Sequence, residues 1–245
     1  MQPIIADWDA PKNVHALTST RLGGVSEAPY AGLNLGDHVS DDPAAVGQNR
    51  QQLIDALGLQ QSPQWLQQVH GITVVKAEAD GSVPEADACW SDRPGQACIV
   101  MTADCLPVFF ADKQGSRVAV AHAGWRGLAD GVLEATLNCF DDPAQVVCWL
   151  GPAIGPEAFE VGGEVREQFC ALLPASEQAF KPVAGKESDD KWLADIYQLA
   201  RLRLNAAGVT RVSGGEHCTF SDADQFYSYR RDGVTGRMAS VIWLD

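Results

Sequence analysis

Two neighbouring stretches, ACIVMTADCLPVFFA (97–111) and SRVAVAHAGWRG (116–127), decide the fold of this chain. The first is a nearly continuous apolar run, which is typical of a strand buried on both faces. The second predicts another such strand that ends at His122, and the following GLADGVLEATLNCF (127–140) predicts a helix. VVCWLGPAIG (146–155) repeats the pattern of a buried strand that enters a glycine turn. We therefore expect an α/β protein whose sheets are covered on both faces.

Outward from this centre, helical and strand patterns intermix without the strict alternation of a doubly wound protein. Asp42-Pro43 is typical of a helix start, and Gly58 ends the run of apolar residues at helical spacing that follows. This mixture predicts a mixed sheet instead of a parallel one. The other expected elements are a strand at 14–20 with a turn at Gly23-Gly24, a hairpin of 65–70 and 72–77 around Gly71, an amphipathic helix over 191–207, and a closing hairpin of 226–231 and 236–244.

The composition indicates a globular protein in a reducing compartment. The 245 residues are 46% hydrophobic and 20% charged, and no linker or repeat divides them, so we expect one domain over 1–245. The net charge of -14 makes nucleic acid and membrane surfaces unfavourable partners. The start lacks a signal-peptide pattern, and no stretch approaches the ~20 apolar residues of a spanning helix. The seven cysteines are scattered without a CxxC pair, which favours a cytoplasmic protein.

His70, Cys105 and His122 each end or interrupt a very apolar segment. They are 35 and 17 residues apart, so they meet only if their strands lie side by side with converging ends. Two imidazoles and a thiolate suit Zn²⁺, and three protein ligands leave a fourth position for water or substrate. The spacing alone leaves another interpretation open, in which the cysteine is a small hydrophobe and the histidines are hydrogen-bonded core residues.

A second group of residues suggests a site for an anion. HAGWRG (122–127) puts glycines directly before a helix, where backbone N–H groups can face a phosphate. The loop 19–43 is long enough to indicate function, and guanidinium groups in it or beside it can grip phosphate bidentately. Solvated surface arginines explain the same pattern. The candidates for binding phosphate or substrate are Arg21, Asn34, His38, Arg50 and Arg126.

Several motifs occur together and in order from about residue 14 to the end of the chain. They are STRLGGVS…LNLG…NR, QVHG, TADCLP, HAGWRG, GPAIG…FEVG, HCTF, FYSYRR and GRMASVIWL. Together they resemble the YfiH-like family, which is also called the laccase-domain or polyphenol oxidoreductase family. The combination of HAGWRG, ADC and QVHG makes this resemblance highly specific.

The resemblance implies a four-layer α-β-β-α sandwich of mixed sheets. It also implies a zinc site on His70, Cys105 and His122, which agrees with the choice made from the residues themselves. The activity that it implies is phosphate-dependent cleavage of adenosine, inosine, guanosine and S-methyl-5′-thioadenosine, with adenosine deamination as a second activity. The expected partners are purine nucleosides and phosphate, and the expected state is a monomer.

In such an enzyme, Arg21 and Arg50 would place the phosphate, and the loop with Asn34 and His38 would close over the ribose. Deamination would use zinc to activate water. Asp104 is a candidate for the proton carrier of that step. However, side chains alternate along a strand, so Asp104 would point to the face opposite that of Cys105.

Two other enzyme classes stay open. The older family name suggests a copper polyphenol oxidase, but a blue-copper centre takes two histidines and leaves three of the five, too few for a trinuclear cluster. Copper is still an alternative occupant of the same site. A cysteine hydrolase would use Cys105 as nucleophile and His122 as base, and family members have been linked to peptidoglycan editing. Metal content separates the hydrolase from the zinc enzyme, because a zinc-bound thiolate is not a free nucleophile.

Overall fold

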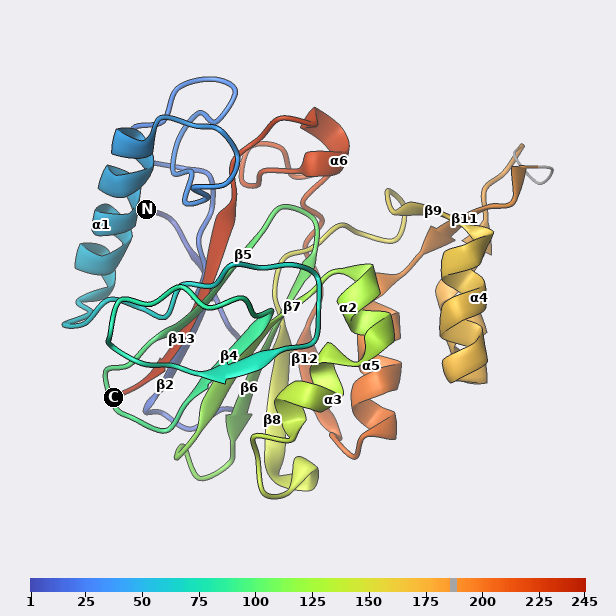
Figure 1. Ribbon diagram of the computed structural model, residues 1–245. Helices are drawn as coiled ribbons and strands as arrows, with labels where there is room; N and C mark the ends of the chain where they lie inside the picture. The colour runs from blue at the N-terminus through green and yellow to red at the C-terminus, as the bar shows by residue number, and fades with distance from the viewer. Residues whose placement is uncertain (186–188) are drawn as a thin grey trace.

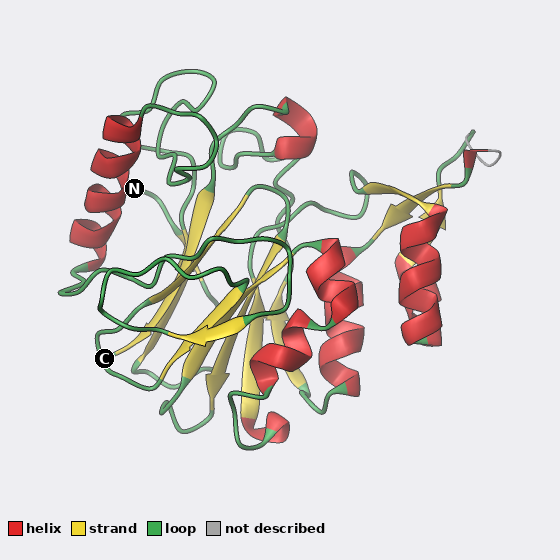
Figure 2. Ribbon diagram, in the orientation of Figure 1, coloured by secondary structure: helices red, strands yellow, loops and turns green. Residues whose placement is uncertain are grey.

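The computed structural model describes residues 1–185 and 189–245. Within these ranges the strands form three sheets (Figures 1 and 2). The larger sheet has the strand order β12 (Arg211–Gly214), β8 (Val146–Leu150), β6 (Leu106–Asp112), β7 (Val118–Ala123), β4 (Ala88–Ser91) and β3 (Val74–Lys76). The second sheet has the order β1 (Ile4–Ile5), β2 (Val14–Thr18), β13 (Met238–Leu244) and β5 (Cys98–Thr102). The small sheet has the order β10 (Phe180–Pro182), β11 (Lys191–Ala194) and β9 (Glu160–Gly162).

Helices cover the outer faces of the larger and second sheets (Figure 1). α1 (Pro43–Leu57) packs on the second sheet through Leu53, whereas α2 (Trp125–Asp130), α3 (Val132–Leu137) and α5 (Ile196–Ala206) pack on the larger sheet. α4 (Gly163–Leu172) contacts the small sheet, and the remaining short elements are η1 (Pro143–Gln145), η2 (Pro174–Ala179) and α6 (Tyr229–Asp232). The layers therefore follow the order helix, sheet, sheet, helix.

Strand directions in the larger sheet are mixed. β12 runs parallel to β8 and β3 runs parallel to β4, whereas the other neighbouring strands of this sheet are antiparallel. The prediction of a mixed α/β protein is therefore confirmed. No helix in the described ranges has the length and apolar character needed to cross a bilayer.

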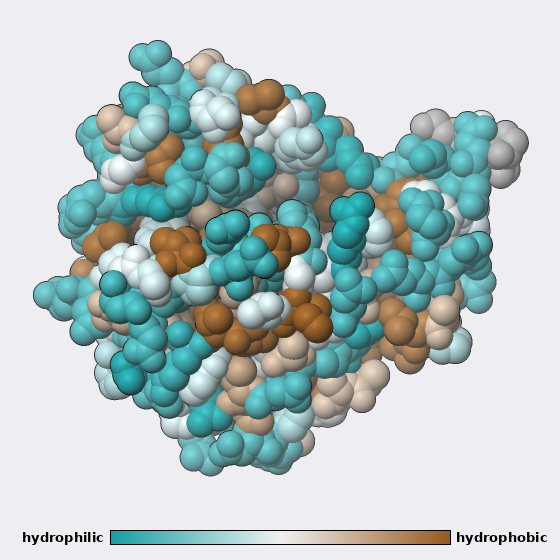
Figure 3. Space-filling model, in the orientation of Figure 1, coloured by the Kyte–Doolittle hydropathy of each residue, from teal (hydrophilic) through white to brown (hydrophobic). Residues whose placement is uncertain are grey.

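The core between the layers explains the continuous apolar runs. Successive residues of a strand point to opposite faces, and both faces of the larger sheet are covered. In β6, Phe109 packs between the two sheets, whereas Phe110 packs on the side of the helices. Both rings are fully buried, and each contributes about 1.5–3 kcal/mol of transfer free energy to folding. The face in Figure 3 is mostly hydrophilic, with hydrophobic residues gathered near its middle.

Both ends of α1 agree with the signals in the sequence. The Asp42 side chain accepts a hydrogen bond from the Ala44 N–H at 2.9 Å, and Pro43 is the first helical residue. Gly58 ends the helix in the left-handed conformation with φ of 65°. This helix is therefore confirmed from its N-cap to its C-terminal glycine.

The prediction of a single strand over 97–111 is wrong, because the segment forms two strands in two different sheets. β5 ends at Thr102 and β6 begins at Leu106. Asp104, which lies between them, has φ of 94°, a left-handed conformation that interrupts the extended chain. The turn leaves Cys105 half-buried at the start of β6 instead of enclosing it in the core.

Both predicted hairpins are also wrong. β3 follows Gly71 but pairs in parallel with β4, and residues 65–70 do not form a strand. Near the end of the chain, the Ser228 side chain accepts a hydrogen bond from the Arg231 N–H and caps α6, so 226–231 does not pair with β13. A side-chain cap within a polar segment favours a turn of helix over an extended strand.

Two helices are shorter than expected. The helix over 127–140 is divided into α2 and α3 at Gly131, which has φ of 105°. The helix expected from residue 191 begins at Ile196, because the Asp195 side chain accepts a hydrogen bond from the Gln198 N–H at 2.9 Å. The residues before Asp195 belong to β11.

Candidate metal centre

Cys105 and His122 come together because β6 and β7 are neighbours in the larger sheet. Their register pairs Pro107 with His122, so the start of β6 lies beside the end of β7. His70 reaches them from the loop before β3 and not from the end of a strand. The structure thus brings the three predicted ligands together, although the expected convergence of strands applies to only two of them.

The donor atoms of His70, Cys105 and His122 all lie within 4.8 Å of one another. The Cys105 Sγ–His70 Nε2 distance is 3.8 Å. Zinc bonds of ~2.3 Å to sulfur and ~2.0 Å to nitrogen at a tetrahedral angle require about 3.5 Å between these atoms. His122 is buried, Cys105 is half-buried and His70 is exposed, so one side of the group is open. The donor set and its spacing fit a zinc ion with a vacant fourth position.

Asp87, which no sequence pattern singled out, fixes this geometry. Its fully buried carboxylate accepts hydrogen bonds from the backbone N–H groups of Val69 (3.2 Å), His70 (2.9 Å) and Gly71 (2.6 Å). It also accepts the Nδ1–H of His122 at 2.8 Å, which leaves Nε2 of that ring free to bind a metal. The Asp87 carboxylate therefore fixes both the loop that carries His70 and the ring of His122.

The charges at this site favour an ionised thiol. Burial alone would raise the pKa of the Cys105 thiol, but the charge of His122 and hydrogen bonds from both ligand histidines lower it to about 6. Burial would lower the pKa of His122, but the Cys105 thiolate and the hydrogen bond to Asp87 raise it to about 9. Burial would raise the pKa of Asp87, but its hydrogen bond with His122 and the charge of that ring hold it below its usual value. The metal-free site is thus a thiolate–imidazolium pair near neutral pH.

The glycines of HAGWRG make room for His70. A Cβ on Gly124 would lie 2.7 Å from His70 Cδ2 and 3.2 Å from Cys105 Sγ. A Cβ on Gly127 would lie 2.8 Å from the carbonyl oxygen of Gly71. The loop of His70 therefore approaches α2 more closely than any larger residue would allow. The helix that follows Gly124 has only 6 residues, so its N-terminus offers little dipole to the anion that we predicted there.

Replacing Gly124 with alanine should weaken zinc binding by about 10- to 100-fold without unfolding the protein. The added methyl group displaces the His70 ring or the Cys105 thiol, and such overpacking costs about 1–3 kcal/mol. Competition with a chromophoric chelator measures the affinity. Gly47→Ala is the matched control, because a Cβ on Gly47 meets nothing within 4 Å. Equal zinc affinities of the two variants would contradict the packing argument.

The ligand group opens into a hollow of about 380 Å³. This volume lies within the range of small-molecule sites, about 300–1,000 Å³. The other lining residues are His38, Gln68, Met101, Thr102, Ala103, Tyr229 and Arg237. Arg237 has no distinguishing signal in the sequence, because it lies in a segment whose pattern predicts a hairpin strand.

The structure brings His38 to this hollow but uses Asn34 elsewhere. Asn34 is fully buried, and its Nδ2 donates to Asp41 Oδ2 at 2.8 Å. Its Oδ1 accepts the backbone N–H of Arg237 at 2.8 Å. The amide of Asn34 therefore ties the loop to the segment that precedes β13, and it does not line the hollow.

The three predicted arginines also do not line the hollow. The Arg21 guanidinium lies over the Tyr227 ring at 4.9 Å. Arg50 pairs with Asp37 at 3.2 Å and contacts the sulfur of Met101, so it lies one layer behind the wall. Arg126 lies over the ring of the preceding tryptophan at 4.5 Å. Aromatic and carboxylate partners already occupy these guanidinium groups in part.

The candidate proton carrier, Asp104, supports the turn beside Cys105. Its carboxylate accepts hydrogen bonds from Thr219 Oγ1 at 2.6 Å and from the Arg230 N–H at 2.7 Å. Asp104 is buried and does not line the hollow. These contacts stabilise its left-handed conformation and leave it poorly placed to exchange protons with a substrate.

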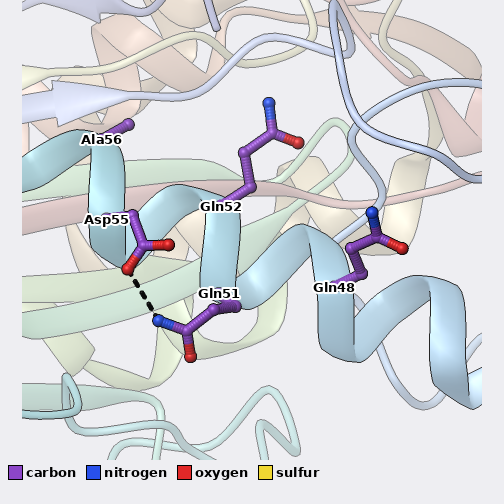
Figure 4. A pocket seen from close by; sticks show the side chains of 5 residues that line it. All are labelled: Gln48, Gln51, Gln52, Asp55 and Ala56. Carbon is purple, nitrogen blue, oxygen red and sulfur yellow. Dashed lines mark hydrogen bonds between the residues drawn. The ribbon is translucent and has the colours of Figure 1, made fainter.

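A larger hollow of about 590 Å³ lies on the outer face of α1. Figure 4 shows its lining side chains, of which Gln51 Nε2 donates to Asp55 Oδ1 at 2.8 Å. The lining holds amides and one carboxylate but neither a cysteine nor a histidine. The larger hollow therefore lacks the metal-binding side chains that line the smaller hollow at His70.

The sequence matches a known protein family over most of its length. The family model described as multi-copper polyphenol oxidoreductase laccase matches residues 15–245. The chain belongs to this laccase-domain family. A laccase-domain relative from Pseudomonas aeruginosa, named purine nucleoside phosphorylase, is 57% identical over 97% of this chain and 96% of its own length. The purine nucleoside phosphorylase YfiH of Escherichia coli is 54% identical, and the match covers 98% of each chain.

Solved structures of laccase-domain proteins confirm the fold. A crystal structure from Neisseria meningitidis superposes with a TM-score of 0.95 at 51% identity and covers 100% of both chains. The structure of YlmD from Geobacillus stearothermophilus has a TM-score of 0.87 at 32% identity and covers 95% of this chain and 92% of its own. The resemblance stated from the motifs is therefore confirmed.

The described part of this laccase-domain chain contains one group of side chains that could hold a metal ion. His15 pairs with Asp245 at 2.6 Å, and His217 packs against the Phe226 ring. Within residues 1–185 and 189–245, His70, Cys105 and His122 are the one group of at least three such side chains that is close enough to share an ion. A trinuclear copper cluster needs more imidazoles than this group contains.

Proposed function

We propose that the protein is a zinc-dependent purine nucleoside phosphorylase that also deaminates adenosine. The observation that carries the proposal is the open group of His70, Cys105 and His122 in the wall of a hollow of about 380 Å³. The relatives named purine nucleoside phosphorylase, at 57% and 54% identity, support the substrate class. The proposed nucleosides are adenosine, inosine, guanosine and S-methyl-5′-thioadenosine.

Phosphorolysis breaks the bond between ribose C1′ and the purine nitrogen and forms a bond from a phosphate oxygen to C1′. The products are the free purine and ribose 1-phosphate. Positive charge develops on the ribose in the transition state, so the protein must hold phosphate close to C1′ and exclude water. A zinc ion on the three ligands would supply a Lewis acid in the wall of the hollow.

The residues of this chain prepare the hollow for that reaction. Asp87 keeps His122 in the tautomer whose Nε2 is free. Gln68 donates to the Met101 carbonyl at 2.8 Å and accepts the Met101 N–H at 2.7 Å, which makes this wall rigid. Met101 and Ala103 offer apolar surface to a purine ring. In the second activity, water replaces the amino group of adenosine and ammonia leaves, and the same hollow would hold the substrate.

Zinc-loaded protein should release hypoxanthine from inosine only when inorganic phosphate is present. Phosphate is a reactant, so ribose 1-phosphate should appear in an amount equal to that of hypoxanthine. Chromatography of the reaction mixture measures both products. Hypoxanthine that forms without phosphate would indicate hydrolysis and reject phosphorolysis. Conversion of adenosine to inosine without phosphate is the separate test of deamination.

A cysteine hydrolase is the second candidate, and the metal-free thiolate–imidazolium pair of Cys105 and His122 favours it. Zinc removal separates the two candidates. If a chelator abolishes phosphorolysis and added zinc restores it, the phosphorylase is supported. Catalysis that survives complete removal of the metal would favour the hydrolase. Zinc should also protect Cys105 from alkylation by iodoacetamide, because the bound thiolate is not a free nucleophile.

A further inference from the structure

Arg237 lies where two hollows meet. It lines the hollow of the metal ligands and a neighbouring one of about 240 Å³. His38 and Tyr229 also line both hollows. Arg237 directly precedes β13, which is a central strand of the second sheet, so its backbone is well anchored.

The loop at residues 33–38 fixes the position of Arg237. The buried Asn34 amide accepts the Arg237 backbone N–H at 2.8 Å. A Cβ on Gly36 would lie 2.7 Å from Arg237 Cγ, so the arginine stem packs directly on the backbone of that glycine. Nη1 donates to the carbonyl oxygens of Thr235 at 2.9 Å and Gly236 at 3.0 Å. Neutral carbonyl groups therefore orient the guanidinium, and no carboxylate of the described residues forms an ion pair with it.

The Arg237 guanidinium lies over the Tyr229 ring at 6.0 Å, farther than the 4.9 Å and 4.5 Å of Arg21 and Arg126 from their rings, and two of its nitrogens keep N–H donors without a partner in the described chain. Among the residues that the structure describes, neither Nε nor Nη2 of Arg237 has a hydrogen-bond partner, and no carboxylate lies within 4.0 Å. Arg50 differs in this respect, because Asp37 pairs with it at 3.2 Å. A guanidinium with free donors on two nitrogens can grip a phosphate bidentately.

Two hydroxyl groups near the same junction also lack partners. Thr102 lines the hollow of the metal ligands, and Thr235 lines the neighbouring one. Both Oγ1 atoms are buried without a hydrogen-bond partner in the described part of the chain. Buried polar groups in proteins are normally satisfied by protein, water or ligand. Both residues line the hollows, so this end of the site contains polar side chains beside Arg237.

The local charge also suits an anion. The chain has a net charge of -14, yet the junction of the hollows presents an unpaired guanidinium. Burial and the charge of Arg237 lower the pKa of His38, which favours the neutral ring, and its Nδ1 lies 3.5 Å from Asp37 Oδ1. Arg237 is close enough to Cys105 for their charges to interact, which places it beside the ligand group.

We propose that Arg237 binds the attacking phosphate at the junction of the two hollows, which His38 also lines. The nucleoside would then occupy the hollow between this phosphate and the metal ligands. The proposal rests on the phosphorylase activity proposed above. It assigns phosphate binding to a residue other than Arg21, Arg50 and Arg126.

The variant Arg237→Gln tests this assignment. It should raise the KM for phosphate by about 10- to 100-fold, the effect of losing one charge-assisted interaction. The KM for inosine and the zinc content should stay within about threefold of the wild-type values. Arg237→Lys keeps the charge without the planar fork and should give an intermediate KM for phosphate. Arg93→Gln is the matched control, because Arg93 is exposed and pairs only with Glu78 within the described chain.

Direct binding separates this inference from the proposed function. Calorimetric titration with inorganic phosphate should show binding to the zinc-loaded wild-type protein and at least 10-fold weaker binding to Arg237→Gln. The same difference in a protein that does not cleave inosine would reject the phosphorylase but support the phosphate site. Equal phosphate affinities would overturn the inference, and so would a variant that raises the KM for inosine alone. If Arg237→Gln does not fold, the phosphate affinity of Arg237→Lys is compared with that of the wild-type protein instead, and equal affinities would again overturn the inference.

Discussion

Replacing Cys105 with alanine should remove bound zinc and lower phosphorolysis of inosine by more than about 100-fold. Loss of a partner that only orients a ligand already costs 10- to 100-fold in metal affinity, so loss of a direct ligand costs more. The wild-type protein should carry one zinc per chain, and the variant should carry almost none after dialysis. Metal analysis and the inosine assay measure the two effects.

The variant should remain folded, because Cys105 is half-buried and lies in a turn at the start of β6. Cys170→Ala is the matched control. Cys170 is also half-buried, but it lies on α4 and is not part of the ligand group. A Cys105→Ala protein that retains one zinc and full activity would contradict the metal centre.

Replacing Asp87 with asparagine should weaken zinc binding by about 10- to 100-fold and destabilise the metal-free protein by about 2–3 kcal/mol. Oδ1 accepts hydrogen bonds from the His70 N–H and His122 Nδ1–H, and Oδ2 accepts those of Val69 and Gly71. Either orientation of the new amide therefore directs an NH₂ group toward two donors. Chelator competition and urea unfolding of the metal-free protein measure the two effects.

Asp92→Asn is the matched control for this substitution. Asp92 pairs with Lys76 at 2.8 Å near the surface, where an ion pair contributes about 0–1 kcal/mol. The pKa of Asp87 is lowered, so its contribution to stability is complete above the usual carboxyl pKa and is lost as the pH falls below it. The Asn variant should therefore lose less stability than the wild-type protein under acid. Equal zinc affinities of the two variants would reject the role of Asp87.

The strands and ligands that could be predicted are those with a strong local pattern. The buried strands around Cys105 and His122 are visible as apolar runs, and the motifs with His70 predict three side chains that the structure brings together. The turn at Asp104 could not be predicted, because its left-handed conformation depends on hydrogen bonds to Thr219 and Arg230 far along the chain. Tertiary contacts therefore decided where one apolar run became two strands.

The residues that support the site left no signal in the sequence. Asp87 lies among ordinary residues before β4, and only the fold brings its carboxylate to the loop of His70. The segment with Arg237 predicts a hairpin strand, because the apolar residues after Arg237 dominate its pattern. The predicted single domain, cytoplasmic location and monomeric state stay predictions.

The place of β13 constrains how the protein is made. β13 lies between β2 and β5, so the second sheet cannot close during synthesis until the segment at 238–244 has left the ribosome. Until then β2 and β5 have free edges, which are sites of aggregation. Transcripts truncated before codon 238 should therefore yield insoluble chains, even though every metal ligand has been translated. Arg237, the proposed phosphate ligand, is translated directly before this strand, so the proposed phosphate site is also completed only when the sheet can close.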